Sequence, residues 1–253
     1  MFTPGVAGYT CGMPPHHSLL PPAPEHAIEP ELSNRSEHRW TSFAVTAALG
    51  WALMFGVCVG LGLLITGPLS DSGLVRWDRQ YPAELEAART AAGETWSHYG
   101  DLMGDTLTVV SIAFAVGLGL MIAKRWASVL LLATALLSEV TVFMATTIVV
   151  PRDRPDVEKL DVSPPTSSFP SGHTAAATTL LLSLAVIVGW SVRSTAIKVT
   201  AWLVAIAVGP IVGISRIYRG MHHPLDVIVG FGLGIACVVV AYLAVRAFVG
   251  EDA

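Results

Sequence analysis

Six long apolar runs constrain this chain more than any other feature of its sequence. A helix needs about 17–25 apolar residues to cross a bilayer, and none of the runs alternates strictly as a membrane β-strand does. Because helices satisfy their own backbone hydrogen bonds in lipid, we expect an all-α polytopic membrane protein, a six-transmembrane-helix bundle. The expected spans are residues 43–66, 105–123, 127–150, 174–191, 197–214 and 225–248.

The composition agrees with a membrane protein and excludes other classes. Of 253 residues, 53% are hydrophobic and 13% are charged, and one soluble core of this size cannot bury so much apolar surface. The three cysteines are an odd number and do not form a disulfide scaffold. The net charge of −4, without a basic stripe, argues against a nucleic-acid partner.

The chain divides into a tail and a membrane domain. Residues 1–40 hold seven of the sixteen prolines, so we predict a flexible tail, in which the pair His16–His17 lacks further metal ligands. Residues 41–250 form the membrane domain. Within it, the long connection 67–104 mixes aromatic and charged residues, and is either a helix lying at the membrane interface or an ordinary loop.

Short basic turns indicate the orientation. Lys124 and Arg125 lie between the second and third spans, and Arg193 and Lys198 lie between the fourth and fifth. Positive charge in short loops favours the cytoplasm. We therefore expect an integral protein of a bacterial plasma membrane, with both termini cytoplasmic and the 67–104 connection extracytoplasmic.

Three polar clusters lie at span ends on the side opposite these basic turns. With six spans, the third-to-fourth and fifth-to-sixth connections emerge on the same face, so their side chains can meet in one pocket. The clusters are residues 151–155 (PRDRP), 169–173 (FPSGH) and 215–226 (SRIYRGMHHPLD).

The residue types in these clusters suit a tetrahedral anion. Arg154 and Arg216 come from different loops, and their planar guanidinium groups can hold phosphate oxygens from two directions. Ser171 and Gly172 immediately precede the fourth span, where free backbone N–H groups and the helix dipole bind anions.

The third cluster also contains a candidate nucleophile. Pro224 fits the first turn of the last span. If the helical turn extends back to His222, the i,i+4 spacing places Asp226 beside its imidazole. A carboxylate on one ring nitrogen fixes the tautomer and leaves the other nitrogen free to attack.

In these motifs the sequence resembles the type 2 phosphatidic acid phosphatases (PAP2), which include bacterial undecaprenyl-diphosphate phosphatases. The family pattern is Lys-x6-Arg-Pro, then Pro-Ser-Gly-His, then Ser-Arg-x5-His-x3-Asp. The resemblance covers about residues 43–248 and departs at Thr147, where the family has lysine; Arg152 could supply that cation. The matching residues are Arg154, Pro155, Pro170, Ser171, Gly172, His173, Ser215, Arg216, His222 and Asp226.

The resemblance implies a metal-independent phosphatase without a cofactor. His222 is expected to form a phosphohistidine, Asp226 to support its imidazole, and His173 to protonate the leaving oxygen, which predicts a bell-shaped pH profile. The phosphate-binding set is expected to be Arg154, Arg216, Ser171, Gly172, Arg152 and Thr147.

The implied substrate is a lipid phosphate or diphosphate hydrolysed at the extracytoplasmic face. Isoprenoid diphosphate, phosphatidylglycerol phosphate and phosphatidic acid are all compatible. Two alternatives stay open: a non-catalytic protein that binds or transports lipid phosphates, and a lipid phosphotransferase on the same scaffold.

Glu139 lies near the middle of the third span, where an ionised carboxylate is costly, so it should face the bundle interior. It precedes Thr147 by eight residues, roughly 12 Å along a helix, which places it below the expected pocket. We expect a structural interhelical hydrogen bond; a proton or ion path is the alternative.

Overall fold

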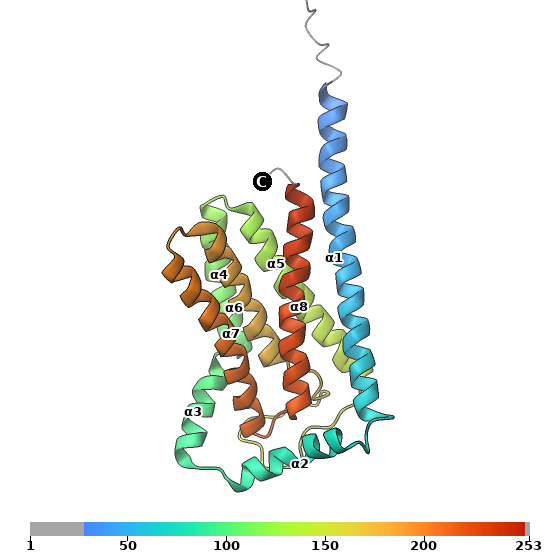
Figure 1. Cartoon of the computed structure of the whole chain (residues 1–253), viewed down its shortest axis with the longest axis vertical. Helices are drawn as coiled ribbons and strands as arrows, with labels where there is room; N and C mark the ends of the chain where they lie inside the picture. Colours follow the sequence, from blue (N-terminus) through green and yellow to red (C-terminus); the bar gives the residue numbers. More distant parts are fainter. Residues whose placement is uncertain (1–27, 251–253) are drawn as a thin grey trace, which may run out of the picture. The chain divides into compact units, whose positions relative to one another are not determined.

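The structure is a computed structural model that describes residues 28–250, with side chains from residue 37 onward. Within that range the fold is all-α, with eight helices and no strand (Figure 1). The helices are α1 (Ile28–Thr66), α2 (Gly73–Ala87), α3 (Ala91–Leu102), α4 (Thr106–Ile122), α5 (Trp126–Val149), α6 (Gly172–Ser191), α7 (Thr195–Tyr218) and α8 (Pro224–Val249).

The prediction of six spans is confirmed, and the chain is an integral membrane protein. Six segments of the described residues are long and apolar enough to cross a bilayer, with α3 and α4 together making the second. Pro210 does not end the fifth span, because α7 continues to Tyr218. The six segments are Glu37–Thr66, Ala91–Ile122, Trp126–Val149, Gly172–Ser191, Thr195–Tyr218 and Pro224–Val249.

The chain forms two compact units, Met1–His38 and Arg39–Ala253. In the first, residues 28–38 are helical and begin α1, so the predicted flexible tail is wrong from Ile28 onward. Pro30 lies in the first helical turn, where proline is tolerated, and no further proline follows before Pro68. Residues 1–27, including the His16–His17 pair, lie outside the described residues.

In the second unit, α6 is the most buried span and packs against α5, α7 and α8. Leu131 of α5, Leu180 of α6 and Val238 of α8 belong to one buried apolar cluster. These contacts hold α6, whose N-terminus carries the Pro-Ser-Gly-His motif, next to α5, α7 and α8, whose ends carry the other two motifs.

The 67–104 connection is helical, which favours an interface helix over an ordinary loop. Ser72 caps α2 by accepting a hydrogen bond from the backbone N–H of Val75. Trp77 and Leu74 are exposed, whereas Val75 and Asp78 are buried. Figure 1 shows α2 lying across the end of the bundle where the α5–α6 connection and the α7–α8 turn are found. The position of α2 at a membrane surface stays a prediction.

Candidate active site

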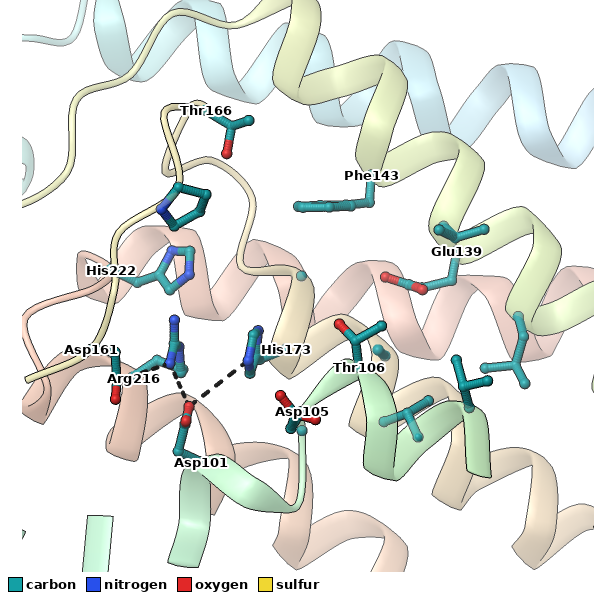
Figure 2. Close-up of a pocket in the computed structure, with 18 of the residues that line it drawn as sticks. Asp101, Asp105, Thr106, Glu139, Phe143, Asp161, Thr166, His173, Arg216 and His222 are labelled. Carbon is teal, nitrogen blue, oxygen red and sulfur yellow. Dashed lines mark hydrogen bonds and ion pairs between the residues drawn. The ribbon is translucent and has the colours of Figure 1, made fainter. Parts of the chain in front are cut away.

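The three motifs line one cavity of about 690 Å³. Arg154 comes from the α5–α6 connection, His173 from the first turn of α6, Arg216 from the last turn of α7, and His222 from the turn before α8. Figure 2 shows the imidazoles of His173 and His222 in this shared space. Residues that are far apart in sequence therefore lie around one cavity. This agrees with the six spans, which place the α5–α6 and α7–α8 connections on the same face of the membrane.

The His222 ring is held by its Nδ1 atom. That nitrogen lies 2.8 Å from the backbone carbonyl oxygen of Ser168, which can only accept, so Nδ1 carries the hydrogen and Nε2 keeps its lone pair. The carboxylate of Asp226 lies 3.7 Å from Nδ1. Because α8 begins at Pro224, His222 stands outside the helix, and its Nδ1–H donates to the Ser168 carbonyl and not to Asp226, the expected partner.

Burial sets the protonation of this imidazole. Burial lowers the pKa of His222 to about 4, and the charges of Arg216 and Arg154 act in the same direction, against the raising effect of Asp226. His222 is therefore neutral at physiological pH, which is the form that has a nucleophilic nitrogen.

Asp226 is the centre of a buried network behind His222. Its carboxylate accepts a hydrogen bond of 2.9 Å from the backbone N–H of His223 and pairs with the guanidinium of Arg152. Arg152 also pairs with Asp78 of α2, and Asp78 accepts a hydrogen bond of 2.6 Å from the backbone N–H of Leu225. One arginine thus joins two buried carboxylates and ties α2 to the start of α8.

The structure does not bring Arg152 or Thr147 to the cavity. Arg152 is occupied by its two carboxylate partners and does not line the cavity. The Thr147 hydroxyl donates to the backbone carbonyl of Met144 in its own helix and is likewise absent from the cavity wall. The charge of the family lysine has no replacement from either residue.

Two other arginines do line the cavity. Arg154 donates to the carbonyl of Met221 at 2.8 Å, and Arg216 pairs with Asp101 at 2.5 Å and with Asp161 at 3.2 Å. In each, the buried Nε atom has no acceptor among the described side chains and backbone. Burial, together with the charge of Arg216, lowers the pKa of Arg154. Cations placed this close favour an anion between them.

The N-terminus of α6 supplies further donors. Gly172 and His173 line the cavity, and no hydrogen bond is found in the described residues for the backbone N–H groups of Gly172, His173 and Thr174. Such unpaired groups at a helix N-terminus bind anions. Ser171 has a different place: its N–H donates to the carbonyl of Asp226 and its hydroxyl bonds to Thr174, so it joins α6 to α8 away from the cavity wall.

Three aspartates at the cavity were missed by sequence reasoning. Asp101 and Asp105 come from the ends of α3 and α4, and Asp161 from the α5–α6 connection. The Asp101 carboxylate lies 4.0 Å from Nε2 of His173. Burial raises the pKa of Asp161, but its hydrogen bond from Arg219 and the charges of Arg219 and Arg216 prevail and lower it. None of these three aspartates lies in one of the motifs. The only feature of the sequence that indicated them is that they stand in polar segments close to the span ends that carry the motifs.

The expectation for Glu139 is wrong in two respects. This residue lines the cavity, where it was expected to lie below it. No hydrogen bond or ion pair joins Glu139 to any other residue whose side chain is described, so the expected interhelical hydrogen bond is absent. The α4 wall consists of Val109, Val110 and Ala113, with Thr106 at the start of the helix, and no hydrogen bond joins Thr106 to Glu139 among the described residues.

Comparisons with known proteins agree with this geometry. The model of the PAP2 superfamily matches residues 126–249, which run from α5 to α8 and include all three motifs. No curated protein matches the sequence.

Two solved structures share the fold. A PAP2 type phosphatidylglycerolphosphate phosphatase from Bacillus subtilis superposes with a TM-score of 0.65 at 20% identity, covering 77% of this chain and 93% of that chain. LpxE from Aquifex aeolicus superposes with a TM-score of 0.51 at 26% identity, covering 64% of this chain and 93% of that chain. Residues 126–249 thus match the PAP2 superfamily, and the chain shares its fold with two membrane phosphatases of that type.

Proposed function

We propose that the chain hydrolyses the terminal phosphate of a lipid phosphate or diphosphate at the extracytoplasmic face, through a phosphohistidine. The observation that carries the proposal is the state of His222. Its Nδ1–H is bound to the Ser168 carbonyl at 2.8 Å, its Nε2 makes no hydrogen bond to any of the described residues, and Arg154 and Arg216 line the same cavity. A neutral imidazole beside a site built for an anion is suited to attack phosphorus.

The reaction runs in two steps. Nε2 of His222 bonds to phosphorus while the P–O bond to the leaving group breaks, and His173 gives the leaving oxygen its proton. Water then loses a proton to His173 and attacks the phosphohistidine, which releases inorganic phosphate and restores both imidazoles. Arg154, Arg216 and the N–H groups at the start of α6 stabilise the equatorial oxygens in both steps.

The acidic residues around the arginines have positioning roles. Asp101 holds Arg216 and stands 4.0 Å from His173, so it stabilises the positive charge of His173 whenever that imidazole carries the proton. Asp226 stabilises the positive charge that develops on His222 during attack, and Arg152 holds Asp226 in place.

Lateral entry would bring a lipid to this cavity from the bilayer. Away from the imidazoles, most of the cavity wall consists of apolar side chains of α4 and α5, with Thr106 and Glu139 as the polar residues of these two helices. Several of them also face outward: Val110 is 56% exposed, Leu137 is 63% exposed and Val140 is 44% exposed. A phosphate can reach the arginines while its hydrocarbon chains remain between these helices and the lipid. The Lys124–Arg125 turn is at the other end of α4, which supports an extracytoplasmic site.

The pH at which activity is lost in acid should lie far below the usual pKa of a histidine. Because the pKa of His222 is lowered to about 4, the nucleophile loses its proton as pH rises through about 4 and is neutral above it. We expect kcat/KM to fall only below pH 5. Initial rates of phosphate release from pH 3.5 to 9 measure this, and an acid limb centred near pH 6.5 would contradict the burial of His222.

Phosphate release should persist in EDTA, because arginines and helix N–H groups supply the positive charge. The test uses purified full-length protein in detergent micelles with phosphatidic acid, with and without EDTA. Rates within about twofold are expected. Lipid binding without turnover would overturn hydrolysis in favour of a binding protein, and transfer of label to an added lipid alcohol would indicate a phosphotransferase.

A further inference from the structure

Glu139 of α5 is a buried acid that the reaction does not use. Its side chain is 4% exposed, and it lines the same cavity as His173 and His222. Figure 2 shows its carboxyl group pointing into the cavity. No hydrogen bond or salt bridge joins it to another residue among residues 37–250, and the buried thiol of Cys237 on α8 is the ionisable group with which it interacts. A carboxyl group that is buried without a hydrogen-bonding partner destabilises the empty protein.

The contact between α5 and α6 shows where Glu139 lies relative to the phosphate site. The ring of Phe143 packs on Gly172 at the N-terminus of α6, since a Cβ atom at Gly172 would lie 2.9 Å from that ring. Glu139 precedes Phe143 by four residues, which is roughly one turn or 6 Å along α5. On α6, Ala176 lies one turn beyond Gly172 and also lines the cavity. Glu139 is thus one turn deeper than the phosphate-binding helix end.

A lipid phosphate places its first carbon atoms at that depth. When phosphate occupies the polar end of the cavity, the atoms two to four bonds beyond the phosphoester oxygen reach the level of Glu139. A hydroxyl, ester or amide there can exchange a hydrogen bond with the carboxyl group. An isoprenoid monophosphate has only hydrocarbon there and would leave the carboxyl group unpaired and further desolvated, and an isoprenoid diphosphate would bring its inner, anionic phosphate against the carboxyl group.

We propose that Glu139 determines substrate specificity by hydrogen bonding to a polar backbone next to the phosphate. The substrate class is then a lipid phosphate built on glycerol or a similar polar unit, in preference to an isoprenoid phosphate. This inference rests on the proposed hydrolysis at His222, and it selects among the substrates that the motifs alone leave open.

The test compares two lipids on matched variants. Glu139→Leu removes all hydrogen bonding at similar volume, Glu139→Gln keeps it, and Leu136→Met is a volume-conserving control in the same wall. For Glu139→Leu, kcat/KM on phosphatidic acid should fall about 10- to 100-fold, while kcat/KM on a polyprenyl phosphate stays level or rises. Glu139→Gln should stay within about fivefold on both lipids, and Leu136→Met should not change the ratio.

Several results would overturn the proposal. They are an equal loss on both lipids in Glu139→Leu, no loss on phosphatidic acid, and a wild-type preference for the polyprenyl phosphate. Absence of phosphate release from both lipids would instead refute the proposed hydrolysis. Competition of each lipid against a fluorescent phosphatidic acid, measured on the same variants, would then still decide the role of Glu139, with the same reversal of preference expected in binding.

Discussion

Replacing His222 with alanine is expected to reduce phosphate release by a factor of about 10⁴ or more. The variant loses the only atom that bonds to phosphorus in the proposed reaction, whereas the arginines and the N-terminus of α6 still bind substrate. The KM for phosphatidic acid should therefore change far less than kcat. Release of inorganic phosphate in detergent micelles measures both parameters.

The covalent intermediate gives this prediction an independent measurement. Wild-type protein mixed with labelled lipid phosphate and quenched in alkali should carry label that is stable to base and labile to acid, and His222→Ala should carry none. His98→Ala is the matched control, because His98 is an exposed imidazole on α3 that does not line the cavity. It should keep activity within about twofold. Substantial turnover by His222→Ala would show that another group is the nucleophile.

The local sequence pattern was sufficient to predict the six spans and to predict that the three motifs lie in one pocket. Each apolar run is long enough to define one helix without reference to the others, and the number of runs decides which connections share a face. Arg154, His173, Arg216 and His222 could be assigned to one pocket on that ground, and the structure brings them to one cavity.

Side-chain partners could not be predicted, because they depend on packing between distant segments. Arg152 and Arg154 are two residues apart in an irregular connection, and nothing in the spacing says which of them faces the cavity. The answer comes from Asp78 on α2, which occupies Arg152 together with Asp226. Similarly, the hydrogen bond of His222 goes to a backbone carbonyl, that of Ser168, which every residue type possesses.

Glu139 shows the same limit in the membrane interior. Its cost in lipid predicts that it faces inward, and this is correct. Whether an inward face meets a polar neighbour or a cavity depends on how far α4 stands from α5, which the composition of either helix does not encode. The expected hydrogen bond is absent because Val109, Val110 and Ala113 of α4 are apolar and Thr106, at the start of that helix, does not bond to Glu139.

Replacing Arg152 with methionine is expected to give the largest loss of stability among single substitutions around the site. The change leaves Asp78 and Asp226 buried, both 0% exposed, without their shared cation. Removing one partner of a buried ion pair typically destabilises by about 3–5 kcal/mol. The midpoint of thermal unfolding in detergent should fall by roughly 10 °C. Arg76→Met on α2, which removes an exposed arginine, should change it by about 1–2 °C at most.

A double substitution separates charge from packing. If the loss arises from unpaired carboxylates, adding Asp78→Asn to Arg152→Met should recover part of the midpoint, because one of the two unpaired charges is removed. If Arg152 only fills space, the two changes should add. Additive losses would therefore contradict a network held by charge.

The Arg152→Met variant also tests whether Arg152 binds phosphate in place of the family lysine. A cation that touches phosphate would, when removed, mainly raise KM and leave the folded protein stable. A cation that holds Asp226 would lower stability, and would lower kcat because Asp226 no longer stays near His222, with little effect on the KM of the remaining folded protein. The contacts of Arg152 with Asp78 and Asp226 favour the second outcome. Phosphate binding then depends on Arg154, Arg216 and the start of α6, and Thr147→Lys should leave KM nearly unchanged, since position 147 does not reach the cavity.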